Sequence, residues 1–122
     1  MKKRNYKMYL DDILESMNKI ENYTRGLDYE KFVQRDMVID AVIRNFEIIG
    51  EASKNIPEDV RNCYPDIPWG KMVGLRNIVV HAYFGVDLSI IWEIITKNLP
   101  EVKLLIEKSL KKEKNKINDT KK

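Results

Sequence analysis

The apolar residues of this chain recur at steps of three and four, which is the period of an amphipathic α-helix. One stripe predicts a first helix from about Lys3 to Tyr23, with Gly26 as its C-terminal stop. A second stripe predicts a helix from about Lys31 to Lys54, capped by Asp28. The stripes consist of Tyr6, Leu10, Ile13, Leu14, Met17 and Ile20 in the first helix, and of Phe32, Val38, Ile39, Val42, Phe46 and Ile49 in the second.

The second half of the chain predicts shorter helices separated by proline and glycine. A short third helix starts at Pro57, and a connector with two prolines, residues 63–68, leads into a fourth helix at about Trp69. We expect the fourth helix to stop at Phe84–Gly85 and the last helix to begin after Asp87. Pro100 should kink or briefly break that last helix.

These elements predict an all-α fold, a compact bundle of about four to five helices that forms dimers. The sequence has no strand pattern, no internal repeat and no glycine-rich phosphate loop. We expect one helical domain over residues 1–110. The remainder, residues 111–122, is rich in Lys and Asn without apolar support, and it predicts a basic, frayed tail.

The composition narrows the class of protein further. Hydrophobic residues make up 43% and charged residues 34%, with no apolar run long enough to span a membrane and no N-terminal signal peptide. Cys63 is the sole cysteine, which excludes an internal disulfide and a cysteine metal cluster and favours a cytoplasmic location. The net charge of +3 comes largely from the tail; it permits an RNA partner, although a charge run is more often solvated surface.

Three charged residues share one side of the predicted second helix. Arg44, Glu47 and Glu51 fall at positions i, i+3 and i+7, which favours an intrahelical ladder of ion pairs. Gly50 costs about 1 kcal/mol relative to Ala inside a helix, so we expect it to permit close packing of a neighbouring helix. A second hypothesis is that the two carboxylates orient Arg76 or His81.

The fourth helix contains the chemically distinctive stretch, Arg76 to Tyr83. On a helical wheel Leu75, Ile78, Val79 and Ala82 form a core face, whereas Asn77 and His81 are neighbours on the opposite side. Val73 and Val80 interrupt that polar side, which indicates that another helix or a second copy of the chain covers it.

Arg76 and His81 are the residue types needed for metal-independent phosphodiester cleavage. A guanidinium binds phosphate with a bidentate fork, and a histidine in the last turn of a helix favours its protonated form. Because cleavage needs both an acid and a base, the single histidine of the chain predicts a dimer with both copies of His81 in one cleft. A lone histidine is more often structural, so the spacing alone does not establish catalysis.

The stretch resembles the R-x4-H-x-Y motif of the HEPN superfamily, and more narrowly that of the HepT-like toxins. Three flanking segments resemble the family as well, so that the likeness covers roughly residues 5–110. They are residues 44–52 (RNFEIIGEA), residues 67–69 with 74–77 before the motif, and residues 86–87 with 91–92 after it.

This resemblance implies the toxin of a type II/VII-like toxin–antitoxin system. It implies a homodimeric, metal-independent endoribonuclease that acts on RNA without a cofactor, with Arg76 and His81 catalytic and Asn77 a polar neighbour. It also implies a cognate minimal nucleotidyltransferase as antitoxin, which transfers AMP from ATP to Tyr83. We place Glu47 and Glu51 beside these residues as supporting groups.

Two other functions remain open from the sequence. One is a non-catalytic HEPN dimer that binds nucleotide or protein as a subunit of a nucleotidyltransferase complex. The other is a purely structural subunit of such a complex. The structural alternative for Tyr83 is an aromatic residue that packs at the end of its helix.

Overall fold

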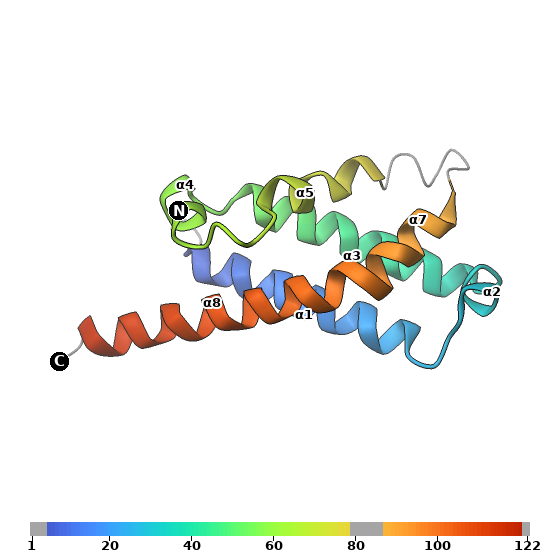
Figure 1. The fold of residues 1–122 in the computed structure, drawn as a ribbon, viewed down its shortest axis with the longest axis horizontal. Coiled ribbons are helices and arrows are strands. Elements are labelled where there is room, and N and C mark those ends of the chain that lie inside the picture. The colour runs from blue at the N-terminus through green and yellow to red at the C-terminus, as the bar shows by residue number, and fades with distance from the viewer. Residues whose placement is uncertain (1–4, 79–86, 121–122) are drawn as a thin grey trace.

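The computed structural model describes residues 5–78 and 87–120, and every regular element in those two ranges is helical. The predicted all-α fold class is therefore confirmed for the described residues. Three long helices run along one another: α1 (Tyr6–Thr24), α3 (Asp36–Lys54) and α8 (Leu99–Thr120). Figure 1 shows α1 antiparallel to both of the others. Short helices connect them: α2 (Tyr29–Phe32), α4 (Glu58–Cys63), α5 (Trp69–Val73) and α7 (Leu88–Glu93), with a π-helical turn η1 (Ile94–Asn98).

The core lies between α1 and α3, and α8 and α5 pack on either side of that pair. The predicted apolar stripes supply it, because Leu10, Ile13 and Ile20 of α1 are fully buried, as are Val42 and Phe46 of α3. Burial of such side chains is the main stabilising contribution in a domain of this size. No helix in the described part of the chain is long and apolar enough to cross a membrane.

The predicted end of the first helix and start of the second are confirmed by local hydrogen bonds. Gly26 has a φ of +79°, and Leu27 N donates to Thr24 O at 3.0 Å, as in a turn that requires glycine at its third position. The side chain of Asp28 accepts from Lys31 N at 2.9 Å and caps α2.

The predicted second helix is two helices. The first ends at Phe32 and the second begins at Asp36. Arg35, just before the second helix, has non-helical dihedral angles. Periodicity does not detect this break, because the apolar stripe continues across it. The ring of the buried Phe32 packs against Trp92, with ring centroids 5.0 Å apart.

Pro100 changes the helix before it without ending it. Proline has no N–H to donate to the carbonyl four residues earlier, so a regular helix cannot pass through it unchanged. Here Leu99 N donates to Ile94 O, five residues back, and the turn widens into η1 before α8 begins. A π-turn is a known way to accommodate such an interruption, so the expected kink takes the form of a wider turn.

The frayed tail expected from Lys111 onward is not what the structure shows for residues 111–120, because α8 continues to Thr120. The reason is a contact that periodicity does not reveal. Glu113 is only 2% exposed, and its carboxylate accepts hydrogen bonds from the hydroxyls of Tyr6 and Tyr64. A charged residue that reads as tail surface therefore holds the helix end on α1 and the connector after α4.

Candidate active site around Arg76

Arg76 belongs to a short helical segment, residues 75–78, that follows α5 after a turn at Gly74. The wheel assignment holds for the described part of this segment. Leu75 is 7% exposed and belongs to the core, Ile78 packs against the core, and Asn77 is exposed. The predictions for Val79, Val80, His81, Ala82, Tyr83 and the stop at Phe84–Gly85 lie outside the described residues.

Gly50 is where α3 and the Arg76 segment cross. A Cβ added at Gly50 would lie 2.5 Å from Arg76 Cγ and 3.3 Å from both Arg76 Cδ and the Arg76 backbone nitrogen. Carbon atoms do not approach that closely without a shift of one of them. The expectation that Gly50 permits close packing of a neighbour is therefore confirmed, and the packed neighbour is the arginine of the motif.

The side chain of Arg76 passes over Gly50 and ends at Glu51. Its Nη1 lies 2.7 Å from Glu51 Oε1, and the two side chains are 42% and 49% exposed. An ion pair so open to water contributes at most about 1 kcal/mol to folding. Its effect is on orientation: it fixes the guanidinium on the exposed side of α3.

This pairing corrects the expected intrahelical ladder along α3. Glu51 pairs with Arg76 from another helix, and neither Arg44 nor Glu47 forms an ion pair within the described ranges. The helical spacing places the three charges on one side, but the crossing at Gly50 brings a competing cation to Glu51. The sequence left two hypotheses for these carboxylates, a ladder along α3 or orientation of Arg76 or His81. For Glu51 the geometry favours orientation of Arg76.

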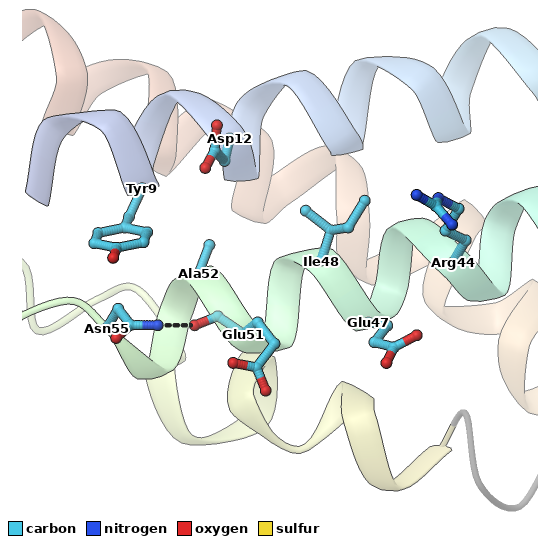
Figure 2. Close-up of a pocket in the computed structure, with 8 residues that line it drawn as sticks. All are labelled: Tyr9, Asp12, Arg44, Glu47, Ile48, Glu51, Ala52 and Asn55. Carbon is cyan, nitrogen blue, oxygen red and sulfur yellow. Dashed lines mark hydrogen bonds between the residues drawn. The ribbon is translucent and has the colours of Figure 1, made fainter. Parts of the chain in front are cut away.

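A surface groove of about 420 Å³ runs between α1 and α3 beside this ion pair. Figure 2 shows Glu47 and Glu51 on the side of α3 that faces the segment 69–78, whereas Arg44 lies nearer α1. The groove residues contributed by α3 extend from Arg44 to Ala52, with Asn55 just after the helix. Its lining residues are Tyr9, Asp12, Arg44, Glu47, Ile48, Glu51, Ala52 and Asn55.

Tyr9 and Asp12 were not among the residues that the sequence predicted for this site. They are one turn apart on α1, on the flank of its apolar stripe, and both are partly buried. A polar pair at i, i+3 next to a core stripe is the signal that could have identified them, although it is common on helices. Each has an interaction with another group, so neither is an empty binding position.

Within residues 5–78 and 87–120, Asn77 and Glu47 have no side-chain hydrogen bond or ion pair that fixes a role for them. Asn77 is exposed one residue after Arg76, and Glu47 lies one turn before Glu51 on the same side of α3. Their supporting roles stay predictions. The described residues contain no group of three or more His, Cys, Asp or Glu side chains that could hold a metal ion.

Comparisons with known proteins show the family of the chain. The family model described as Ribonuclease HepT-like matches residues 13–109, and the chain belongs to this family. The chain is 47% identical to the candidate RNase MJ1380 of Methanocaldococcus jannaschii, over 88% of this chain and 98% of that protein.

Two further relatives extend the comparison. The chain is 45% identical to a protein of Thermococcus cleftensis named "Probable ribonuclease HepT", over 87% of this chain and 96% of that one. It is 39% identical to the candidate RNase TTE0752 of Caldanaerobacter subterraneus subsp. tengcongensis, over 87% and 95%. No solved structure matches the chain. The recognition of a HepT-like member of the HEPN superfamily is thus confirmed.

Proposed function

We propose that this protein is an endoribonuclease that cleaves RNA without a metal ion, and that it is the toxin of a toxin–antitoxin pair in the cytoplasm. The observation that supports this best is the position of Arg76, held across Gly50 by Glu51 on an exposed face. Family membership and the names of the relatives point to the same class of activity.

In the proposed reaction the 2′-hydroxyl of a ribose attacks the neighbouring phosphorus. A base removes the proton of that hydroxyl, the bond from phosphorus to the 5′-oxygen breaks, and an acid gives a proton to the leaving oxygen. Arg76 neutralises the charge on the phosphate oxygens as it builds up. Glu51 must yield or share the guanidinium when the phosphate binds, which a half-exposed ion pair allows at small cost.

His81 is the proposed acid or base, and a homodimer supplies the second one from the other copy. Each chain has one histidine, so a symmetric cleft is the direct way to bring two imidazoles to one phosphate. In this proposal Asn77 and Glu47 are polar neighbours that help to position the phosphate and Arg76.

The proposed regulator is a minimal nucleotidyltransferase antitoxin. The phenol oxygen of Tyr83 would attack the α-phosphorus of ATP, pyrophosphate would leave, and the phenol proton would pass to solvent. The resulting ester adds negative charge and bulk two residues from His81, where the RNA phosphate must bind.

The central test is RNA cleavage by the purified protein in EDTA, compared with His81→Ala and Arg76→Ala. We expect each substitution to lower the rate by about 10²-fold or more, as is typical for loss of an acid–base group or of a charge-stabilising donor. Arg25→Ala is a matched control, because Arg25 is an exposed arginine whose side chain donates a hydrogen bond to Asn22 at the end of α1. Unchanged cleavage in both site variants, or its loss in EDTA, would overturn the proposal.

The dimer and the antitoxin need separate measurements. Light scattering gives the oligomeric state, and a fully active monomer would contradict the two-histidine mechanism. Mass spectrometry after co-expression with the neighbouring nucleotidyltransferase gene should find AMP on Tyr83. Tyr83→Phe should remain toxic in the presence of that partner.

A further inference from the structure

The C-terminal half of α8 carries a dense group of exposed lysines. Residues 108–116 contain five lysines and one glutamate, and Lys108, Lys111, Lys112, Lys114 and Lys116 are all exposed. The sequence alone favours a solvated, frayed tail here. In the structure the segment belongs to helix α8.

The one acidic residue among these lysines does not neutralise them at the surface. Glu113 is buried, and its carboxylate accepts hydrogen bonds from Tyr6 and Tyr64, with Lys116 Nζ at 3.3 Å. Its negative charge is thus directed at the interior side of α8. The outer side of the helix presents lysines, with Glu107 at its margin.

Helical geometry groups three of the lysines on one face. At about 100° per residue, Lys108, Lys111 and Lys112 lie within about 100° of one another. That face is opposite to Ile106 and Leu110, which are buried in the core. Side chains at i, i+3 and i+4 are neighbours along the helix, so the positive charges form a continuous row.

The hydrogen bonds of Glu113 also fix the position of this part of α8 in the bundle. Tyr64 bonds Glu113 with its hydroxyl, and its backbone oxygen accepts from Trp69 Nε1 at 3.1 Å, at the start of α5. Arg76 follows in the segment after α5, beyond the turn at Gly74. The lysine row is therefore held at the end of the bundle near α4, and α5 runs away from that end towards the proposed site (Figure 1).

We infer that the lysine face of α8 binds the phosphate backbone of RNA and docks long substrates on the protein outside the proposed cleavage site. Lysines act as point charges for phosphate and read no bases, so the binding is independent of sequence. A membrane surface fits less well, because a membrane-binding helix needs an exposed apolar face. The apolar side of α8 is buried in the core, and in the described part of α8 Leu104 is the large apolar residue that is exposed. This inference rests on the proposed function, since it takes RNA as the substrate.

The test compares two triple variants in a His81→Ala background, which prevents cleavage during the binding measurement. One is K108Q/K111Q/K112Q. The other is K19Q/K31Q/K54Q, which removes three exposed lysines from α1, α2 and α3 and so has the same net charge. Far-UV circular dichroism checks that both fold as the parent does. Binding of a long, labelled, mixed-sequence RNA is followed by fluorescence anisotropy over a series of salt concentrations.

For the α8 variant we expect binding that is about tenfold weaker or more at low salt, and a salt slope that is smaller by about 2. That change follows from the loss of three phosphate contacts on a single strand. The control variant should keep the parent slope. In the protein that retains His81, the α8 substitutions should raise KM for long RNA.

Failure of the inference and failure of the proposed function give different results. If the parent binds and cleaves RNA and the two triple variants have equal affinity and slope, the docking surface is wrong and the function stands. If the parent does not bind RNA at all, both are wrong. If the α8 variant loses affinity for polyglutamate or for anionic vesicles but not for RNA, the face has another partner and the inference is overturned.

Discussion

Glu51 and Glu113 both meet partners from outside their own helices, and they do so in opposite environments. Glu51 pairs with Arg76 at a half-exposed crossing, whereas Glu113 is buried under two tyrosine hydroxyls. Water screens the first pair, so its partner remains able to bind a phosphate. The second is shielded from water, so its hydrogen bonds hold helices together. The exposed pair therefore orients a functional group, and the buried cluster maintains the fold.

The ionisation of the buried cluster follows from its contacts. Burial alone raises the pKa of Glu113, but hydrogen bonds from Tyr6, Tyr64 and Lys116 together outweigh it and lower that pKa below its usual 4.5. The hydrogen bond to Glu113, with burial, raises the pKa of Tyr6 from 10.0 to about 12. Burial and the bond to Glu113 raise the pKa of Tyr64 as well. The cluster is thus most stable with a charged glutamate and neutral tyrosines.

The largest effect on the exposed pair should come from Gly50→Ala. The added methyl would displace Arg76, and a misplacement of about 1 Å can lower an enzymatic rate by about 100-fold. Gly70→Ala is the control, because a Cβ there meets no atom within 4 Å. RNA cleavage and urea unfolding would be measured on both. Full activity of Gly50→Ala would show that the position of Arg76 does not matter.

Glu113→Ala should have the reverse profile, with lower stability and unchanged chemistry. It leaves the hydroxyls of Tyr6 and Tyr64 without their acceptor and opens a space in the packing, at a cost of about 2 kcal/mol. Glu107→Ala, an exposed position on the same helix, should change the free energy of unfolding by less than about 0.5 kcal/mol. Equal urea midpoints for the two variants would show that Glu113 does not stabilise the fold.

The pH dependence of stability separates the two glutamates further. The lowered pKa of Glu113 means that its contribution is present above about pH 4.5 and is lost as the pH falls below that value. The raised pKa of Tyr6 means that its contribution is present below pH 10 and is lost between pH 10 and about pH 12. The stability difference between wild type and Glu113→Ala should therefore shrink at both extremes. A difference that is constant with pH would contradict the cluster.

The smallest effect is expected for Glu51→Gln. The amide can still accept one hydrogen bond from Arg76 but no longer attracts it as a charge, so we expect cleavage to fall by a few fold. Stability should change by less than about 1 kcal/mol, because the pair is half exposed. Glu58→Gln, an exposed acid on α4, serves as the comparison. A large loss of stability in Glu51→Gln would show that the Arg76–Glu51 pair maintains the fold, as the Glu113 cluster does.

The sequence by itself determined the features that depend on neighbours along the chain. Caps such as Asp28, the turn glycine Gly26 and the apolar stripes of α1 and α3 act within a few residues, so their pattern is sufficient. The motif around Arg76 likewise predicted the family. The position of His81 and Tyr83 next to that arginine stays a prediction from helical spacing.

Only the tertiary structure decided which charges meet. Arg76 is 25 residues from Glu51 along the chain, and the crossing at Gly50 brings the two together. Glu113 reads as tail surface until Tyr6, 107 residues away along the chain, is brought beside it. Periodicity records which face of a helix is apolar, but the partner of a polar side chain depends on the distance and angle between helices. That geometry is set by the packing of the whole bundle.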